Sequence, residues 1–126
     1  MTDRREQIAV TYMSGPLDGK TLYWELPPDA EEMVVNIGRR EGSDILLDYD
    51  SQVSRVHARV VYHVASDSFF LEDAGSRNGT FIGQQKLREK ERAALKPGEL
   101  FRVGRTWLRI EPPEEDNLLS DDDLPF

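Results

Sequence analysis

The sequence predicts an all-β fold, an antiparallel β-sandwich. Apolar and β-branched stretches recur every 8 to 20 residues, and residues that favour turns stand between them. No segment has the strand-helix-strand spacing of a parallel sheet. The 126 residues, of which 38% are hydrophobic, suffice for a single core and leave no room for a second domain.

The N-terminal part of the chain predicts four short strands. Residues 8–13 (IAVTYM) and 21–26 (TLYWEL) flank a segment that contains Gly, Pro and Asp. These are turn residues, so the two strands are expected to form a hairpin. Two further strands are expected at 33–38 (MVVNIG) and 44–47 (DILL).

Residues 56–64 (VHARVVYHV) alternate in the way that a half-buried strand requires. One side of this predicted strand carries Val56, Ala58, Val60, Tyr62 and Val64, and the other carries His57, Arg59, Val61 and His63. One of the two faces is therefore expected to point into the core.

The C-terminal part predicts strands at 68–74 (SFFLEDA), at 81–83 (FIG), and twice between 100 and 110 (LFRVG and TWLRI). Residues 86–95 (KLREKERAAL) are the only helical candidate. This segment is rich in charge and ends at Lys96-Pro97-Gly98, so we expect a loop or one frayed turn there.

The composition changes abruptly after Ile110, where EPPEEDNLLSDDDLPF holds seven acidic residues and no basic one. Such a segment cannot bury enough apolar surface to order itself. We therefore expect a folded domain over residues 1–110 and a disordered acidic tail over 111–126. The tail is either a solvated end, a docking motif that uses its leucines, or a weak competitor for the basic loops described below, through residues 114–123.

Charge and composition exclude several classes of protein. The net charge is -8, but residues 1–110 carry 17 acidic residues against 16 basic ones, which is a poor match for a nucleic-acid backbone. No apolar run approaches the roughly 20 residues of a membrane-spanning helix. The absence of cysteine excludes disulfides and thiolate metal sites. We expect a soluble, cytoplasmic and monomeric protein without nucleic-acid or membrane partners.

Three short clusters on this pattern point to an anion site. Each places a guanidinium, a hydroxyl or a carboxamide beside a turn, so strand ends can bring them around one oxyanion. The clusters are Gly38-Arg39, Ser54-Arg55-Val56-His57 and Arg77-Asn78-Gly79-Thr80. A phosphothreonine carries about -1.5 to -2 charges and three acceptor oxygens, so its receptor needs fixed donors rather than catalytic groups.

With Ile37 before the first cluster and Phe81-Ile82-Gly83 after the third, these residues resemble the motifs of the forkhead-associated (FHA) domain. The resemblance runs from about residue 8 to residue 110. It implies a β-sandwich of about eleven strands whose loops at one end bind phosphothreonine peptides.

The resemblance also implies a role for each site residue. Arg39 and Ser54 match the positions that bind the phosphate, and Arg55 matches a position that faces it. Asn78 matches the carboxamide that holds the peptide backbone. The structural support of the site is implied to come from Gly38, His57, Gly79 and Thr80.

Two peripheral residues are candidates for choosing the peptide. Gln52 lies in the loop that, by resemblance, helps to select the residue three after the phosphothreonine. Arg77 either favours an acidic residue on the peptide or is a surface charge beside a turn.

Each motif also has a plainer interpretation. Asn78-Gly79 alone is typical of a type I′ hairpin turn, and with Thr80 it also forms a glycosylation sequon. A histidine such as His57 is more often structural than active. A second Gly-Arg, at Gly104-Arg105, is expected to be only a strand end.

Enzymatic and metal sites fit the sequence less well. Ser54, His57 and Asp73 are the residue types of a hydrolase triad, but no Gly-x-Ser-x-Gly elbow surrounds the serine. His57 and His63 are six residues apart without a spacing that joins them to carboxylates, and residues 121–123 lack the glycine and alternating ligands of an EF-hand. We expect no enzymatic activity, no cofactor and no metal.

The sequence therefore predicts an adaptor that binds phosphothreonine in partner proteins and acts in Ser/Thr kinase signalling. The alternative is a β-sandwich that binds unmodified partners along an exposed strand edge, with the arginines as surface charge only.

Overall fold

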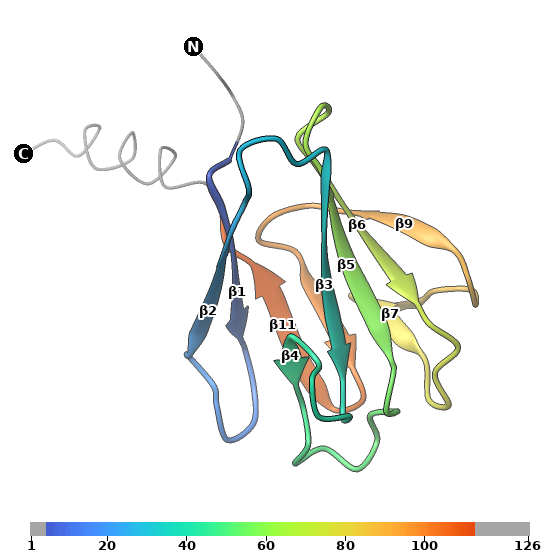
Figure 1. The fold of residues 1–126 in the computed structure, drawn as a ribbon. Helices are drawn as coiled ribbons and strands as arrows, with labels where there is room; N and C mark the ends of the chain where they lie inside the picture. Colours follow the sequence, from blue (N-terminus) through green and yellow to red (C-terminus); the bar gives the residue numbers. More distant parts are fainter. Residues whose placement is uncertain (1–4, 113–126) are drawn as a thin grey trace, which may run out of the picture.

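Eleven strands form in the computed structural model, which describes residues 5–112. They make two sheets that pack as the layers of a sandwich (Figure 1). In spatial order, the six-stranded sheet consists of β2 (Thr21–Glu25), β1 (Gln7–Tyr12), β11 (Thr106–Ile110), β10 (Leu100–Val103), β7 (Thr80–Ile82) and β8 (Gln85–Lys86). The five-stranded sheet consists of β4 (Ile45–Leu46), β3 (Glu32–Gly38), β5 (Ala58–His63), β6 (Ser68–Asp73) and β9 (Arg92–Leu95).

Alternating side chains build the core between the sheets. In β6, Phe69, Leu71 and Asp73 are buried, while Ser68, Phe70 and Glu72, which alternate with them, are partly exposed. Tyr62 of β5 lies against Phe69, with 4.7 Å between the ring centroids. The predicted β-sandwich is confirmed, and so is the half-buried strand over residues 58–63, although Val61 on its outward side is also buried. The prediction was wrong for the first two residues, because Val56 is exposed, His57 is buried and the strand begins only at Ala58.

The predicted N-terminal hairpin is confirmed. β1 and β2 pair in antiparallel fashion from Gln7 opposite Glu25 to Thr11 opposite Thr21. One pair departs from the antiparallel pattern, because β4 lies parallel to β3, with Ile37 opposite Ile45. β4 follows β3 after only a short loop and forms one edge of the sheet. Of its two residues, Ile45 is fully buried.

The expectation of a loop or frayed turn at 86–95 was wrong for part of that segment. Residues 92–95 form β9, which pairs with β6 from Glu72 opposite Arg92 to Phe69 opposite Leu95. Leu95 is buried in the core, and Ala93 is partly buried. Pairing with β6 therefore overrides the local charge and the high helix propensity of Ala and Leu.

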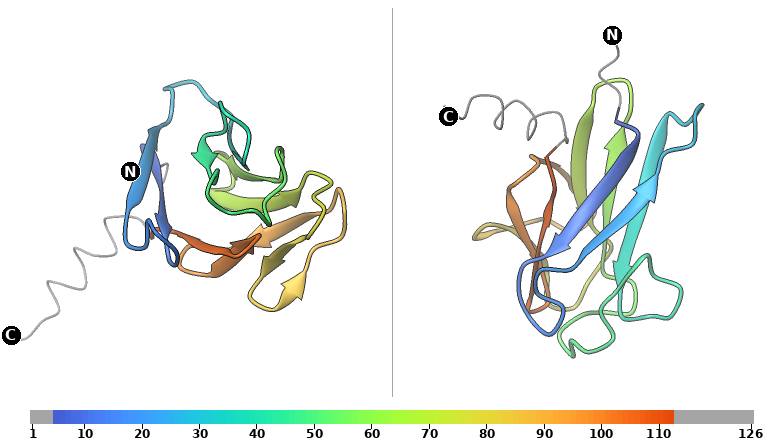
Figure 2. Two further views of the ribbon diagram at one scale, coloured as in Figure 1. Left: turned by 90° about the horizontal axis from the view of Figure 1, so that it is seen from below. Right: turned by 90° about the vertical axis from the view of Figure 1, so that its left-hand side faces the viewer.

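The loops at one end of the sandwich bring the three sequence clusters together. This end contains the end of β3, the loop from β4 to β5, the loop from β6 to β7 and the turn between β10 and β11 (Figure 1). Figure 2, left, views the molecule from this end and shows the two layers edge-on. We call it the loop end.

β11 finishes at the opposite end (Figure 1). Glu111, which the sequence analysis counts with the tail, still contacts the sheet: its backbone N donates to Ala9 O at 2.9 Å, and its carboxylate accepts from Thr11 Oγ1 at 2.5 Å. The predictions for the rest of the tail concern residues 113–126, which lie outside the described residues. Within residues 5–112, no helix is long and apolar enough to span a membrane.

Candidate anion-binding site

The backbone holds the first two clusters side by side. Arg39, the first residue after β3, donates its backbone N to Ser54 O at 3.0 Å, and the next residue, Arg40, donates to Arg55 O at 3.2 Å. Gly38 is buried here, and a side chain on it would collide with the carbonyl oxygen of Arg55. The close approach of the end of β3 to the loop between β4 and β5 therefore requires a glycine at this position.

His57 joins the second cluster to the third. Its ring is buried, and its Nδ1 accepts a hydrogen bond from the backbone N of Ser54 at 2.9 Å. Because that amide can only donate, the ring proton is on Nε2, which donates to Gly79 O at 2.9 Å. Burial lowers the pKa of His57 below its usual 6.5, although the Gly79 carbonyl, Asp73 and Asp50 oppose this effect. The neutral ring is thus the structural form.

Polar side chains connect the two loops on the solvent side. Ser54 Oγ accepts from the backbone N of Arg77 at 2.9 Å, so its own hydrogen is left for another acceptor. Asn78 Nδ2 donates to Gln52 O at 2.9 Å. The structure therefore brings Gln52, Ser54, Arg77 and Asn78 together at the loop end. Asn78-Gly79 is not the turn of a hairpin, because β6 and β7 lie in different sheets.

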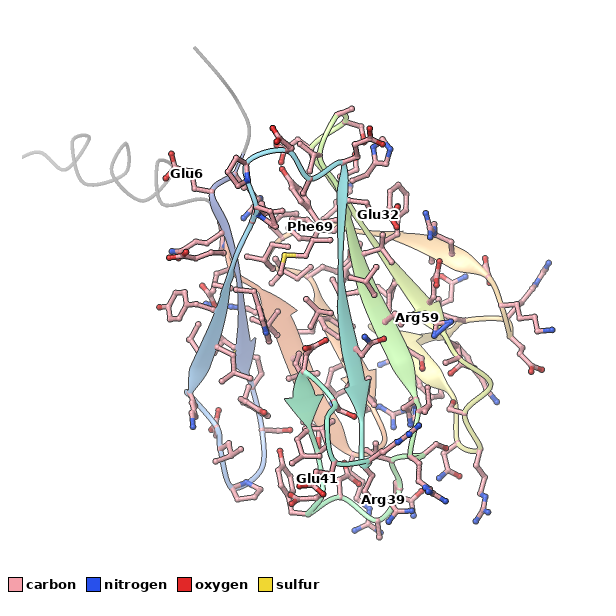
Figure 3. All side chains as sticks on the ribbon, viewed as in Figure 1. Glu6, Glu32, Arg39, Glu41, Arg59 and Phe69 are labelled. Carbon is pink, nitrogen blue, oxygen red and sulfur yellow. The ribbon has the colours of Figure 1, made fainter. Side chains whose placement is uncertain are left out.

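The arginines of the site are exposed, and within residues 5–112 none of them forms an ion pair with a carboxylate. Figure 3 shows Arg39 at the loop end, far from Glu6 and Phe69. Arg39 Nε donates to Val53 O at 2.9 Å, which fixes the guanidinium and leaves its two terminal nitrogens without a hydrogen-bond partner among the described residues. Arg55 and Arg77 are exposed as well.

The ion pairs among residues 5–112 all lie elsewhere. They are Arg5–Asp67, Arg59–Glu72, Arg92–Glu72 and Arg109–Glu111. Arg40, which the sequence analysis did not select, adds a further exposed arginine at the loop end. Several cations without carboxylate partners, beside a hydroxyl with a hydrogen to donate, form a site that can bind a multivalent oxyanion.

Two buried carboxylates hold these loops. The sequence analysis named Asp73 only as a residue type of a hydrolase triad and did not name Asp50. Asp73 accepts from Ser76 Oγ at 2.5 Å, from Thr80 Oγ1 at 2.6 Å, and from the backbone N of Gly75 and Ser76 at 3.0 and 3.1 Å. Ser76 Oγ in turn accepts from Gly79 N at 2.9 Å. Burial raises the pKa of Asp73, but these donors outweigh it and hold the pKa below the usual 3.8. The signal in the sequence is Asp-Ala-Gly-Ser, typical of an Asx turn.

Asp50 holds the loop from β4 to β5 through a similar set of hydrogen bonds. Its carboxylate accepts from Gln52 N at 3.0 Å, from Arg105 N at 2.8 Å and from Thr106 Oγ1 at 2.7 Å. The loop from β4 to β5 is thereby tied to the turn between β10 and β11. Gly104-Arg105 forms this turn, in agreement with the expected strand end.

The triad residues are not arranged for nucleophilic catalysis. His57 bonds to the backbone N of Ser54 and not to its hydroxyl, and Asp73 bonds to Ser76 and Thr80. His63 bonds to Ser66 through Nδ1, at 3.0 Å. In the part of the chain that the structure describes, no group of three or more His, Asp or Glu side chains is placed to hold a metal ion.

A sandwich that presents cations and hydrogen-bond donors on the loops of one end has the form of a binding module for anionic ligands. The family model described as the FHA domain matches residues 35–104, and the chain belongs to this family. FHA domains are phosphopeptide-binding modules.

Curated relatives include protein FraH of a Nostoc species, 36% identical over 88 residues, which cover 64% of this chain and 29% of FraH. FhaB of Mycobacterium tuberculosis, an FHA domain-containing protein, is 32% identical over 81 residues, or 64% of this chain and 49% of FhaB. The chain thus spans less than half of either relative.

The fold is similar to solved FHA structures. One is the N-terminal FHA domain of Rad53p from S. cerevisiae, in complex with a phosphothreonine peptide. It superposes with a TM-score of 0.68 over 89% of this chain and 98% of the yeast domain, at 20% sequence identity. At this identity the likeness establishes the fold.

Proposed function

We propose that this chain binds phosphothreonine-containing segments of partner proteins at the loop end and acts as an adaptor in Ser/Thr kinase signalling. The observation that carries the proposal is the set of exposed arginines without carboxylate partners around the Ser54 hydroxyl. In this arrangement Arg39 and Ser54 bind the phosphate, Arg55 adds charge, and Asn78 holds the peptide backbone. The phosphothreonine complex of the structurally similar Rad53p domain supports this assignment.

Calorimetry with a phosphothreonine peptide selected from a library tests the proposal. We expect micromolar affinity, and no measurable binding of the unphosphorylated peptide. A hydrogen bond to a charged group contributes about 1.5 to 3 kcal/mol, so Arg39→Ala should weaken binding roughly 10- to 150-fold. Arg59→Ala is the matched control, because Arg59 lies on the outer face of β5, away from the loop end (Figure 3). Equal affinities of wild type and Arg39→Ala would refute the proposal.

We also propose that the site captures its ligand without catalysis, since the Ser54 hydroxyl has no base among its hydrogen-bond partners. We further propose that the chain acts as a monomer in the cytoplasm and that it has no nucleic-acid or membrane partners. Size-exclusion chromatography, cell fractionation and an esterase assay with a chromogenic substrate test these parts separately.

A second candidate function is binding of unmodified partners along a strand edge. It is favoured by a cleft of about 210 Å³ beside the free edge of β9, with Ile82, Leu87 and Ala93 among its lining residues. Binding that persists without the phosphate and in Arg39→Ala would support this candidate instead.

A further inference from the structure

Lys86 lies beside the proposed site, although it comes from a different strand. It stands on β8, opposite Phe81 of β7. A Cβ atom placed on Gly79 would lie 2.6 Å from Lys86 Cε and 3.4 Å from Lys86 Cδ, so the lysine stem lies across this glycine. Because Gly79 directly follows Asn78, the ammonium group, one bond beyond Cε, lies at the rim of the site.

The position of Lys86 depends on the local structure around Gly79. This glycine has a φ of +92°, which L side chains rarely adopt, and its bare surface makes room for the lysine stem. The ring of Phe81 approaches the same point, with its Cε1 atom 3.4 Å from the added Cβ. On the other side of Phe81, the Arg102 guanidinium lies 4.1 Å from the ring centroid. Positive charge therefore continues from the loop end onto the outer face of the six-stranded sheet.

No carboxylate within the described residues forms an ion pair with Lys86. Glu91 and Glu99 line the same cleft as Lys86, but each is used by a nearby turn. Glu91 Oε1 accepts from Arg88 N at 2.8 Å, and Glu99 Oε1 accepts from Lys96 N at 3.0 Å. The exposed ammonium group is thus available to a ligand.

We propose that Lys86 pairs with a carboxylate of the bound peptide, so that the site prefers phosphothreonine segments with Asp or Glu close to the phosphothreonine. This inference rests on the proposed function. Gly79 adjoins Asn78, the residue assigned to the peptide backbone, so the carboxylate is expected on a residue close to the phosphothreonine. An extended chain advances about 3.3 Å per residue, so moving one Asp through the flanking positions locates it. Lys86 is in this way a specificity residue, separate from the residues that bind the phosphate.

Fluorescence-anisotropy titrations with designed peptides test the proposal. Each peptide carries one phosphothreonine, with a single Asp moved through the flanking positions and alanine at those positions in the reference peptide. An exposed ion pair is worth little, so wild type should prefer the best Asp peptide by about two- to fivefold. Lys86→Ala should remove this preference without changing the affinity for the reference peptide. Lys86→Glu should reverse it in favour of a peptide with Lys at the same position.

Lys96→Glu is the matched control. It makes the same charge change in the turn after β9, beside the end of β11, where Gly98 N donates to Ile110 O. It should keep the wild-type preference. An unchanged Asp preference in Lys86→Glu overturns the role of Lys86, and loss of the preference in Arg77→Ala would assign the carboxylate to Arg77 instead. A wild type that binds phosphothreonine peptides with no Asp preference overturns this inference alone, whereas no binding of any phosphothreonine peptide overturns the proposed function as well.

Discussion

Single buried polar residues determine whether the site exists. The ring of His57 connects two loops, because one nitrogen bonds to the backbone N of Ser54 and the other to the backbone O of Gly79. Protonation of the ring would place a second N–H against the amide of Ser54, so the site tolerates only the neutral form.

This geometry predicts a pH dependence of stability. Because the folded-state pKa of His57 lies below 6.5, the unfolded chain takes up the proton first. The contribution of the neutral ring to the unfolding free energy is complete above 6.5 and is lost as the pH falls from there through the folded-state pKa. Urea unfolding between about pH 7 and pH 5.5 should show this decrease. His63→Gln should keep the decrease, and a flat profile in wild type would contradict the prediction.

Asp73 should be costly to replace. In Asp73→Ala, two hydroxyls and two amides lose their acceptor, and one of them, the Thr80 hydroxyl, is buried, so we expect a loss of about 2 to 4 kcal/mol in unfolding free energy. Phosphopeptide affinity should fall too, because Ser76 no longer holds Gly79. Urea denaturation measures the first effect and calorimetry the second. Asp48→Ala, a change at an exposed acid, should alter stability by less than about 0.5 kcal/mol.

In wild type, the stabilising contribution of the ionised Asp73 is present above pH 3.8 and is lost as the pH falls through the lower folded-state pKa. The unfolding free energy of Asp73→Asn should therefore decrease less steeply than that of wild type as the pH falls below 3.8. If wild type and Asp73→Asn had the same acid profile, Asp73 would not be ionised in the folded state.

At the scale of elements, the sequence patterns located strands in which apolar and polar residues alternate. They missed strands that form only by pairing with a neighbouring strand. The predicted alternation over residues 56–64 led to β5, although it holds only from Ala58 onward. β9 was not found in this way, because its four residues become a strand only where β6 offers an edge and Leu95 enters the core. β8 has two exposed residues and no apolar pattern at all.

β9 should therefore be held mainly by Leu95, which is 2% exposed. Leu95→Ala should lower the unfolding free energy by about 2 to 5 kcal/mol through the cavity that it leaves. The phosphopeptide affinity of the folded variant should stay within about twofold of wild type, since Leu95 pairs with Phe69 near the start of β6 and the site loop follows the other end of this strand. Ala94→Ser at the exposed neighbour is the control for a change on the same strand. A large loss of affinity would show that β9 supports the site directly.

At the scale of the whole molecule, the residues that meet at the loop end and the supports Gly38 and His57 were predictable from the sequence, but the supporting roles of Asp50 and Asp73 were not. The arginines, Ser54 and Asn78 stand beside turns, which is visible in the sequence. Asp50 and Asp73 act across the fold: Asp50 reaches Thr106, 56 positions along the chain. Such a contact depends on how the sheets pack, and no local pattern encodes it.

The acidic tail offers a prediction at the same scale. Residues 113–126 follow a strand that ends opposite the loop end, and 14 extended residues span up to about 50 Å. Carboxylates are weaker ligands than a phosphate dianion, and exposed charges are screened beyond about 8 Å. Truncation after Pro112, which keeps the contacts of Glu111, should raise phosphopeptide affinity by at most about twofold at low salt. A larger increase that disappears at high salt would instead establish competition by the tail.

The polar ties at the loop end cross from one sheet to the other. Asp73 ends β6 and bonds Thr80 at the start of β7, while Asp50 follows β4 and bonds Thr106 at the start of β11. The site consequently cannot form in either sheet alone, and separation of the two sheets removes it. A bound peptide should then act as a clamp on the entire domain: at a free concentration 100 times its Kd it should add about 2.7 kcal/mol to the unfolding free energy. Phosphorylation of the bound segment would thereby protect this domain itself against thermal unfolding and proteolysis.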